Sequence, residues 1–172
     1  RYKAVVANLL EARGMDYGEL PKGLLLFHGS ADGPRTALEE HLVEGALYAR
    51  NQAGRVNIHL TVSPEHQALF EQLVRRVVPA YESRYGVRYD ISFSTQQPST
   101  DTVAVDLQNQ PFREADGTIL FRPGGHGALI GNLDAMDADV VFIKNIDNVV
   151  PDRMKPVTVT YKQLLAGILV DL

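Results

Sequence analysis

The sequence predicts an α/β domain with a mainly parallel sheet. Segments of strand character alternate with segments of helical character along the chain, and this order is typical of α/β folds. The run at residues 24–27 is short and wholly apolar, as expected for a strand that is buried on both faces. The chain has 172 residues, of which 45% are hydrophobic and 22% are charged, which is enough for one globular domain with a core. We therefore expect residues 1–172 to form a single α/β domain.

Two helices are predicted before residue 50. Apolar residues recur at helical spacing from Tyr2 to Leu10, and Gly14 is placed to end this helix in the left-handed conformation. Thr36 and Glu39 stand at the spacing of a capping box, in which each side chain binds the backbone of the other residue. The second helix is therefore expected to open at Thr36.

Two further long helices are predicted from their capping signals. Ser63 can cap the third helix with Pro64 at its first position, and Pro79 is expected to kink or end it. Thr160 and Gln163 repeat the capping-box spacing ahead of an apolar stripe, which predicts the start of the final helix.

The remaining strands are predicted from alternation and from turn dipeptides. Residues 56–62 and 89–93 alternate between apolar and polar side chains, a pattern typical of strands. The runs 103–105 and 119–121 flank Asp116-Gly117, a hairpin dipeptide. They predict a hairpin excursion over about residues 103–121 at the margin of the sheet. A short helix and a buried strand at 140–143 are expected to follow.

Composition excludes several classes of protein. The chain contains no cysteine, which rules out a disulfide framework and thiolate sites and fits a cytoplasmic setting. The net charge of -4 argues against a nucleic-acid partner, which needs clustered Lys and Arg. No apolar run is long enough to span a membrane, and no signal peptide is visible. Because the chain begins at Arg1 within an amphipathic helix, we expect a fragment of a larger protein, with the rest of the parent chain upstream and downstream.

A glycine loop is the strongest candidate for a binding site. Gly124, Gly125 and Gly127 surround His126, and glycines let the backbone approach a ligand closely and aim N–H groups at it. A following helix would point its positive end at the same place. His126 could donate to a phosphate or a sugar hydroxyl. The alternative is a loop that only turns the chain, with His126 as a solvated loop residue.

Polar side chains after two other strands complete the candidate site. Gln96 and Gln97 offer both a donor and an acceptor, and Asp147 follows the run 140–143. Magnesium prefers hard oxygen ligands and usually takes one or two carboxylates, so Asp147 could hold it. The alternatives are a surface loop for the glutamines and an Asx turn for Asp147. Ligands of α/β sheets bind at the carboxyl ends of strands, so we expect these residues and the glycine loop to share one crevice.

Four motifs in order resemble those of a known enzyme family. They are Pro21-Lys22-Gly23, the stretch from Phe93 to Gln96-Gln97, Pro123-Gly124-Gly125-His126-Gly127, and Ile146-Asp147-Asn148. Together they resemble, over about residues 20–150, the sugar nucleotidyltransferases of the UDP-N-acetylglucosamine and UDP-glucose pyrophosphorylase type. The chain resembles more closely an uncharacterised bacterial family of larger proteins that is labelled only as a domain of unknown function.

The resemblance implies a fold, a reaction and a set of roles. The fold would be a Rossmann-like, GT-A-like nucleotidyltransferase sheet. The reaction would join a nucleoside triphosphate to a sugar 1-phosphate and release pyrophosphate, with Mg²⁺ as cofactor. Gln96 or Gln97 would bind the uracil edge, and the backbone of Gly125-His126 would close on base and sugar. Asp147 would hold the metal, and Lys22 would face phosphate.

One departure from the family pattern leaves other functions open. The family's glycine-rich phosphate loop should directly precede Pro21, and residues 15–20 do not replace it. We therefore expect that this chain alone does not turn over a sugar nucleotide. A non-catalytic module that binds a nucleotide or nucleotide sugar, or regulates through it, is the alternative from a different class. A glycosyltransferase that shares the sheet and its aspartate is a third.

Overall fold

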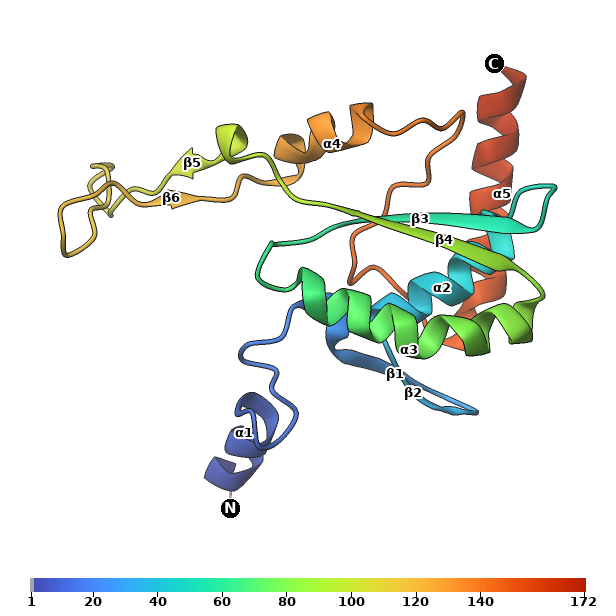
Figure 1. The fold of residues 1–172 in the computed structure, drawn as a ribbon, viewed down its shortest axis with the longest axis horizontal. Coiled ribbons are helices and arrows are strands. Elements are labelled where there is room, and N and C mark those ends of the chain that lie inside the picture. The colour runs from blue at the N-terminus through green and yellow to red at the C-terminus, as the bar shows by residue number, and fades with distance from the viewer. Residues whose placement is uncertain (1) are drawn as a thin grey trace. The chain divides into compact units, whose positions relative to one another are not determined.

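The computed structural model describes residues 2–172 as a mixed α/β chain with small sheets (Figure 1). Its helices are α1 (Tyr2–Leu10), α2 (Ala37–Tyr48), α3 (Gln67–Tyr85), α4 (Ile130–Asp134) and α5 (Lys155–Asp171). Its strands are β1 (Leu26–Ser30), β2 (Gly33–Thr36), β3 (Arg55–Thr61), β4 (Arg88–Ser94), β5 (Thr102–Val103) and β6 (Phe121–Arg122). Short 3₁₀ helices cover Lys22–Leu24, Pro98–Thr100, His126–Leu129 and Asp152–Met154.

The chain divides into two compact units. The first unit contains the described residues through Ile58, together with Glu65–Ser92 and Val140–Leu172. The second unit contains His59–Pro64 and Phe93–Asp139. The first unit is therefore discontinuous in sequence, and its last part follows the second unit along the chain.

Strands pair two by two in the described chain. β1 and β2 form an antiparallel hairpin, and β5 and β6 form another. β3 and β4 form a parallel pair, and α3 connects them. The α/β class predicted from the sequence is confirmed, in the form of small sheets of which one is parallel.

The core of the first unit is built on α2. Leu42 is fully buried and Val43 is 2% exposed, and both pack with Tyr81 of α3. The Tyr89 hydroxyl of β4 donates to the Leu42 carbonyl at 2.8 Å. Burial of such apolar surface stabilises the unit by about 25 cal/mol for each Å² removed from water.

Charged side chains of α2 and β2 are also buried, and each has an opposite charge beside it. Glu40 is 1% exposed and pairs with Lys155 at the start of α5, which is 3% exposed. Arg35 is 4% exposed and donates to Asp152 at 2.6 Å. A buried charge is tolerated only when it is paired and hydrogen-bonded. These pairs therefore fix the start of α5 and the turn before it onto α2 and β2.

The predicted helix starts differ in outcome. The capping box at Thr36 is confirmed, because its hydroxyl accepts from the Glu39 N–H while the Glu39 side chain accepts from the Thr36 N–H. The predicted start at Ser63 and Pro64 is wrong, since α3 begins at Gln67. Of the two effects expected of Pro79, a kink or an end, the end is wrong, since α3 continues to Tyr85.

α3 continues through Pro79 because its surroundings compensate for the missing N–H. Proline deprives the Arg75 carbonyl of its partner, but both residues lie on the exposed side of the helix, where water can bind that carbonyl. On the other side, Val77 and Tyr81 pack in the core and hold the helix in place. α3 ends instead at Tyr85, where Gly86, with a φ of 61°, forms the left-handed cap.

The predicted start of the final helix is wrong. α5 begins at Lys155, with Pro156 in its first turn, a position that proline favours. Thr160 lies inside the helix, and its hydroxyl donates to the Pro156 carbonyl at 3.0 Å.

Three further predictions of local structure differ from the observed one. The first strand begins at Leu26, after a 3₁₀ turn, rather than at residue 24. The predicted buried strand at 140–143 is wrong, because these residues form no helix or strand and Ile143 is 67% exposed. α1 ends at Leu10, and Gly14 is required for close approach instead, since a Cβ there would lie 2.0 Å from the Asn8 carbonyl oxygen.

The predicted hairpin excursion is present in the second unit. β5 and β6 run side by side in Figure 1, and the backbone bridge between Arg113 and Ile119 lies beyond them. Gly117 has a φ of 86°, a left-handed conformation that glycine adopts without a steric cost.

Candidate functional site

Lys22 and Asp147 are in contact in the first unit. The Lys22 Nζ donates to Asp147 Oδ2 at 2.6 Å, although 125 residues separate the two in sequence. The side chains are 64% and 39% exposed, so both are accessible from solvent. Two residues that the sequence selects for phosphate and for metal therefore form one ion pair at the surface.

The glycine between Lys22 and the first strand makes this contact possible. Gly23 is buried, and a Cβ built on it would lie 2.5 Å from the ring of Phe70 and 3.3 Å from the side chain of Ile146. Any larger residue would push these neighbours away. Because Ile146 directly precedes Asp147, the close packing at Gly23 sets how near Lys22 and Asp147 can lie.

Asp147 lies in a turn. The Asn148 N–H donates to the Asn145 carbonyl at 3.0 Å across it, so the turn interpretation of Asp147 is compatible with its contact to Lys22. Within residues 2–172, no group of three or more His, Asp or Glu side chains could hold a metal ion. Magnesium needs only one or two carboxylates, since water and substrate phosphate complete its shell. A half-exposed carboxylate beside a lysine fits such a shared site.

The segment just before Pro21 has no backbone N–H groups to offer a phosphate. Every N–H from residue 14 to residue 20 donates to a backbone carbonyl, either of residues 8–11 or of Asp16. The bonds to the last turn of α1 run from Met15 to Asn8, from Tyr17 to Leu9 and from Gly18 to Leu10, at 2.7, 3.0 and 3.2 Å. A phosphate loop needs free N–H groups that converge on the ligand. This segment caps α1 instead.

The glutamines and the glycine loop meet in the second unit. Gln96 is half-buried, donates to Asp101 at 3.4 Å, and has its amide nitrogen 3.6 Å from the Cβ position of Gly124. Gln97 is exposed, and its amide nitrogen lies 3.7 Å from the Cβ position of Gly131 in α4. Both side chains therefore line the segment that contains the glycine loop, and Gln96 is the one beside the loop itself.

The glycines of the loop have different surroundings. A Cβ on Gly124 would lie 2.7 Å from the Thr100 carbonyl oxygen, so only glycine fits there. Gly125 and Gly127 have nothing within 4 Å of their Cβ positions. His126 begins a 3₁₀ turn and is exposed. The loop is therefore fixed at Gly124 and open to solvent at the next three residues.

A polar cluster around Ser94 is a feature that the sequence prediction missed. The Ser94 hydroxyl lies 2.8 Å from His59 Nε2, 3.2 Å from the Thr61 hydroxyl and 2.8 Å from Asn132 Nδ2. Asn132 Nδ2 also donates to the Thr95 carbonyl at 2.9 Å, which fixes the orientation of the amide because a carbonyl only accepts. His59 and Thr61 are alternate residues of β3 and share one face. This alternation of polar residues along the strand was the sequence signal that could have predicted the cluster.

The two groups of predicted residues belong to different units. Lys22 and Asp147 lie in the first unit, whereas Gln96, Gln97 and residues 124–127 lie in the second. In the first unit Lys22 contacts Asp147, and in the second unit Gln96 lies beside Gly124. The expectation that both groups face one crevice stays a prediction.

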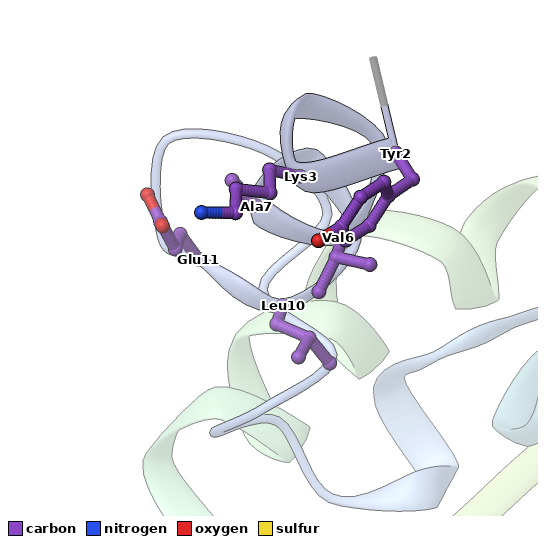
Figure 2. Close-up of a pocket in the computed structure, with 6 residues that line it drawn as sticks. All are labelled: Tyr2, Lys3, Val6, Ala7, Leu10 and Glu11. Carbon is purple, nitrogen blue, oxygen red and sulfur yellow. The ribbon is translucent and has the colours of Figure 1, made fainter.

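Surface hollows occur away from these residues. One runs along α1 and is lined by Tyr2, Lys3, Val6, Ala7, Leu10 and Glu11 (Figure 2). It is an open groove over α1 and the residue that follows it, and so it lacks the enclosed shape of a ligand pocket.

Comparisons with known proteins place the chain in a family. A family described as "Domain of unknown function (DUF4301)" matches residues 1–172. No curated protein and no solved structure matches the chain. Among the described residues, no helix is both long and apolar enough to cross a membrane.

Proposed function

We propose that this chain, which belongs to the DUF4301 family of domains of unknown function, is a portion of a magnesium-dependent sugar nucleotidyltransferase. The full-length parent would join a nucleoside triphosphate, with UTP as the first candidate, to a sugar 1-phosphate. The products would be a nucleoside diphosphate sugar and pyrophosphate. The finer fold belongs to the proposal as well, namely a Rossmann-like, GT-A-like sheet in which β3, α3 and β4 form one parallel unit.

The contact between Lys22 and Asp147 carries this proposal. Both residues were selected from motifs 125 residues apart, and their side chains lie 2.6 Å from each other. A nucleotidyl transfer needs a cation at the phosphates and a carboxylate for the metal, because charge neutralisation contributes most of the rate. An ammonium and a carboxylate at one exposed position supply both.

The roles of the remaining residues follow from their surroundings. Gln96 would bind the uracil edge, since its amide lies beside the glycine loop. Gly125 and Gly127 would let the backbone close on base and sugar, because no protein atom lies within 4 Å of their Cβ positions. His126 would donate to a phosphate or to a sugar hydroxyl. Gln97 would contact the ligand from the side of α4.

Asp147 would hold Mg²⁺, and Lys22 would bind the phosphate that shares the ion. When bound, Mg²⁺ supplies charge neutralisation at the phosphates and orients them. The protein contributes position: the packing of Gly23 against Phe70 and Ile146 keeps the ammonium and the carboxylate together.

A second candidate function rests on a separate observation. The N–H groups of residues 14–20 are all used by backbone carbonyls, so the segment before Pro21 cannot cradle a triphosphate in this conformation. This favours a non-catalytic module that binds a nucleotide or nucleotide sugar and regulates the parent protein. The two candidates share the binding residues and differ in turnover.

Titration calorimetry with UTP, in the presence of Mg²⁺ and in the presence of a chelator, tests the proposed binding. The chain should bind UTP more tightly with Mg²⁺, and Asp147→Asn should remove this gain, because an amide keeps the shape and loses the charge. Asp171→Asn, at the end of α5, makes the same charge change as a control. An equal loss with and without Mg²⁺ would leave Asp147 as a turn residue.

A pyrophosphate-release assay separates the two candidates. We expect no turnover by the chain alone, since removing a single stabilising group costs about two to three orders of magnitude in rate. Release by the full-length parent would support the enzyme, and silence of both proteins would support the binding module. Turnover by the chain alone would refute our placement of the phosphate site.

A further inference from the structure

Two residues of α2 hold the segment that leads to Asp147. His41 and Glu44 are three positions apart on the helix and so lie on one face. Glu44, which is 1% exposed, pairs with Lys144, which is 9% exposed. The His41 Nε2 lies 3.0 Å from the Ile146 carbonyl oxygen. A carbonyl only accepts, so the imidazole donates its Nε2–H.

This segment lacks regular structure of its own. α4 ends at Asp134, and the next element is the 3₁₀ turn that begins at Asp152. Within the described residues 2–172, no helix or strand lies between the two. Ladder hydrogen bonds therefore cannot fix the backbone here. The side chains of α2 do so from one side, and the packing of Ile146 near Gly23 adds a contact from the other.

We infer that His41 and Glu44 are positioning residues for Asp147, which keep its carboxylate at the place where it meets Lys22 and would meet Mg²⁺. This inference rests on the proposed function. His41 acts on the peptide group that joins Ile146 to Asp147, so it controls the direction in which the Asp147 side chain leaves the backbone. Glu44 fixes the same segment two residues earlier through Lys144.

The imidazole is suited to this role because it remains neutral. Burial lowers the pKa of His41, and the positive charges of Lys144 and Lys155 lower it further, while the hydrogen bond to Ile146 and the negative charge of Glu44 oppose the shift. A neutral imidazole brings no extra positive charge close to a site that must attract a cation.

The test compares UTP binding in Mg²⁺ and in chelator for wild type and three variants. His41→Leu removes the hydrogen bond, and His41→Gln keeps an N–H that can reach the carbonyl. Tyr89→Phe is the matched control, because it removes a 2.8 Å hydrogen bond to another α2 group, the Leu42 carbonyl. Residues that orient a metal ligand typically contribute about 10- to 100-fold to metal affinity. His41→Leu should therefore reduce the Mg²⁺-dependent gain by about tenfold or more, with metal-free binding unchanged.

Other outcomes separate this inference from the proposed function. His41→Gln should recover most of the gain, and Tyr89→Phe should keep all of it. If His41→Leu only lowers the melting temperature, as Tyr89→Phe does, and keeps the gain, the positioning role is refuted and the proposed function stands. If the wild type shows no gain with Mg²⁺, the proposed function fails and the inference fails with it.

A second variant covers the case in which His41→Leu does not fold. The double substitution Glu44→Leu with Lys144→Met removes both charges of the buried pair, and such replacements are often neutral for stability. It should fold and still reduce the Mg²⁺-dependent gain. Hydrogen exchange at residues 145–148 should be faster than in the wild type, and unchanged exchange together with an unchanged gain would overturn the inference.

Discussion

Gly23→Ala is expected to destabilise the first unit and to separate Lys22 from Asp147. The new methyl group would lie 2.5 Å from Phe70 Cε1 and 2.6 Å from Cζ, whereas ordinary contact begins at 3.4 Å. Phe70 is only 4% exposed, so its ring cannot withdraw into solvent. Overpacking of this kind costs about 1–3 kcal/mol. In a chain of this size, each kcal/mol lowers the melting temperature by about 2–4 °C.

The assay is thermal unfolding of Gly23→Ala beside a matched glycine substitution. Gly29 lies in β1 with nothing within 4 Å of its Cβ position, so Gly29→Ala should leave the melting temperature nearly unchanged. Binding of UTP in Mg²⁺ is the second measurement, and only Gly23→Ala should weaken it. Equal melting temperatures for the two variants would refute the packing argument, and full Mg²⁺-dependent binding by Gly23→Ala would refute its link to the ion pair.

Three further predictions concern single residues. Lys22→Ala should raise the affinity for Mg²⁺ alone by about 1.4- to fivefold, because an exposed ion pair that competes with the ion contributes about 0.2–1 kcal/mol. Calorimetry without nucleotide measures this affinity, and a lower value than in the wild type would contradict the prediction. Gly125→Val should abolish UDP-sugar binding with the fold intact, whereas Gly124→Ala should unfold the loop, and chemical shifts of the second unit report both. Burial lowers the pKa of His41 below 6.5, so the neutral imidazole stabilises the fold above that pH, and this stability is lost as the pH falls. His41→Gln should therefore flatten the acid side of the profile of melting temperature against pH. An unchanged profile would exclude His41 as the cause of the acid destabilisation.

Local signals predicted some elements well because the determining contacts are local. The capping box of Thr36 needs only residues three apart in sequence, and the structure forms both of its hydrogen bonds. The expected end of the helix at Pro79 is wrong because a proline on the exposed side of α3 can be tolerated. Which side of α3 is exposed depends on packing in the core, and no local pattern shows it. The run 140–143 is apolar, but contacts elsewhere leave Ile143 exposed, so hydrophobicity alone predicted a strand that is absent.

The candidate site was accessible to sequence reasoning only through its motifs. Lys22 and Asp147 could be selected, but their distance could not, since it depends on how a distant ring packs on Gly23. The roles of His41 and Glu44 left no local pattern, because their partners lie 105 and 100 residues away. Which glutamine lies beside the glycine loop likewise depends on tertiary contacts, and the structure selects Gln96.

The buried charges of α2 impose an order on folding during synthesis. Glu40 and Glu44 leave the ribosome 115 and 100 residues before their partners Lys155 and Lys144. Until Lys144 emerges, burying Glu44 leaves its charge without a cationic partner, at a cost of several kcal/mol. Glu40 can pair earlier with Arg35, whose Nη1 lies 3.8 Å from its carboxylate, but it gains its hydrogen bond to Lys155 only at the end of synthesis. All residues of the second unit precede Val140, so it can fold first, as domains do during translation. Synthesis begins and ends within the first unit, so the first unit can be completed only after all of the second unit has been made.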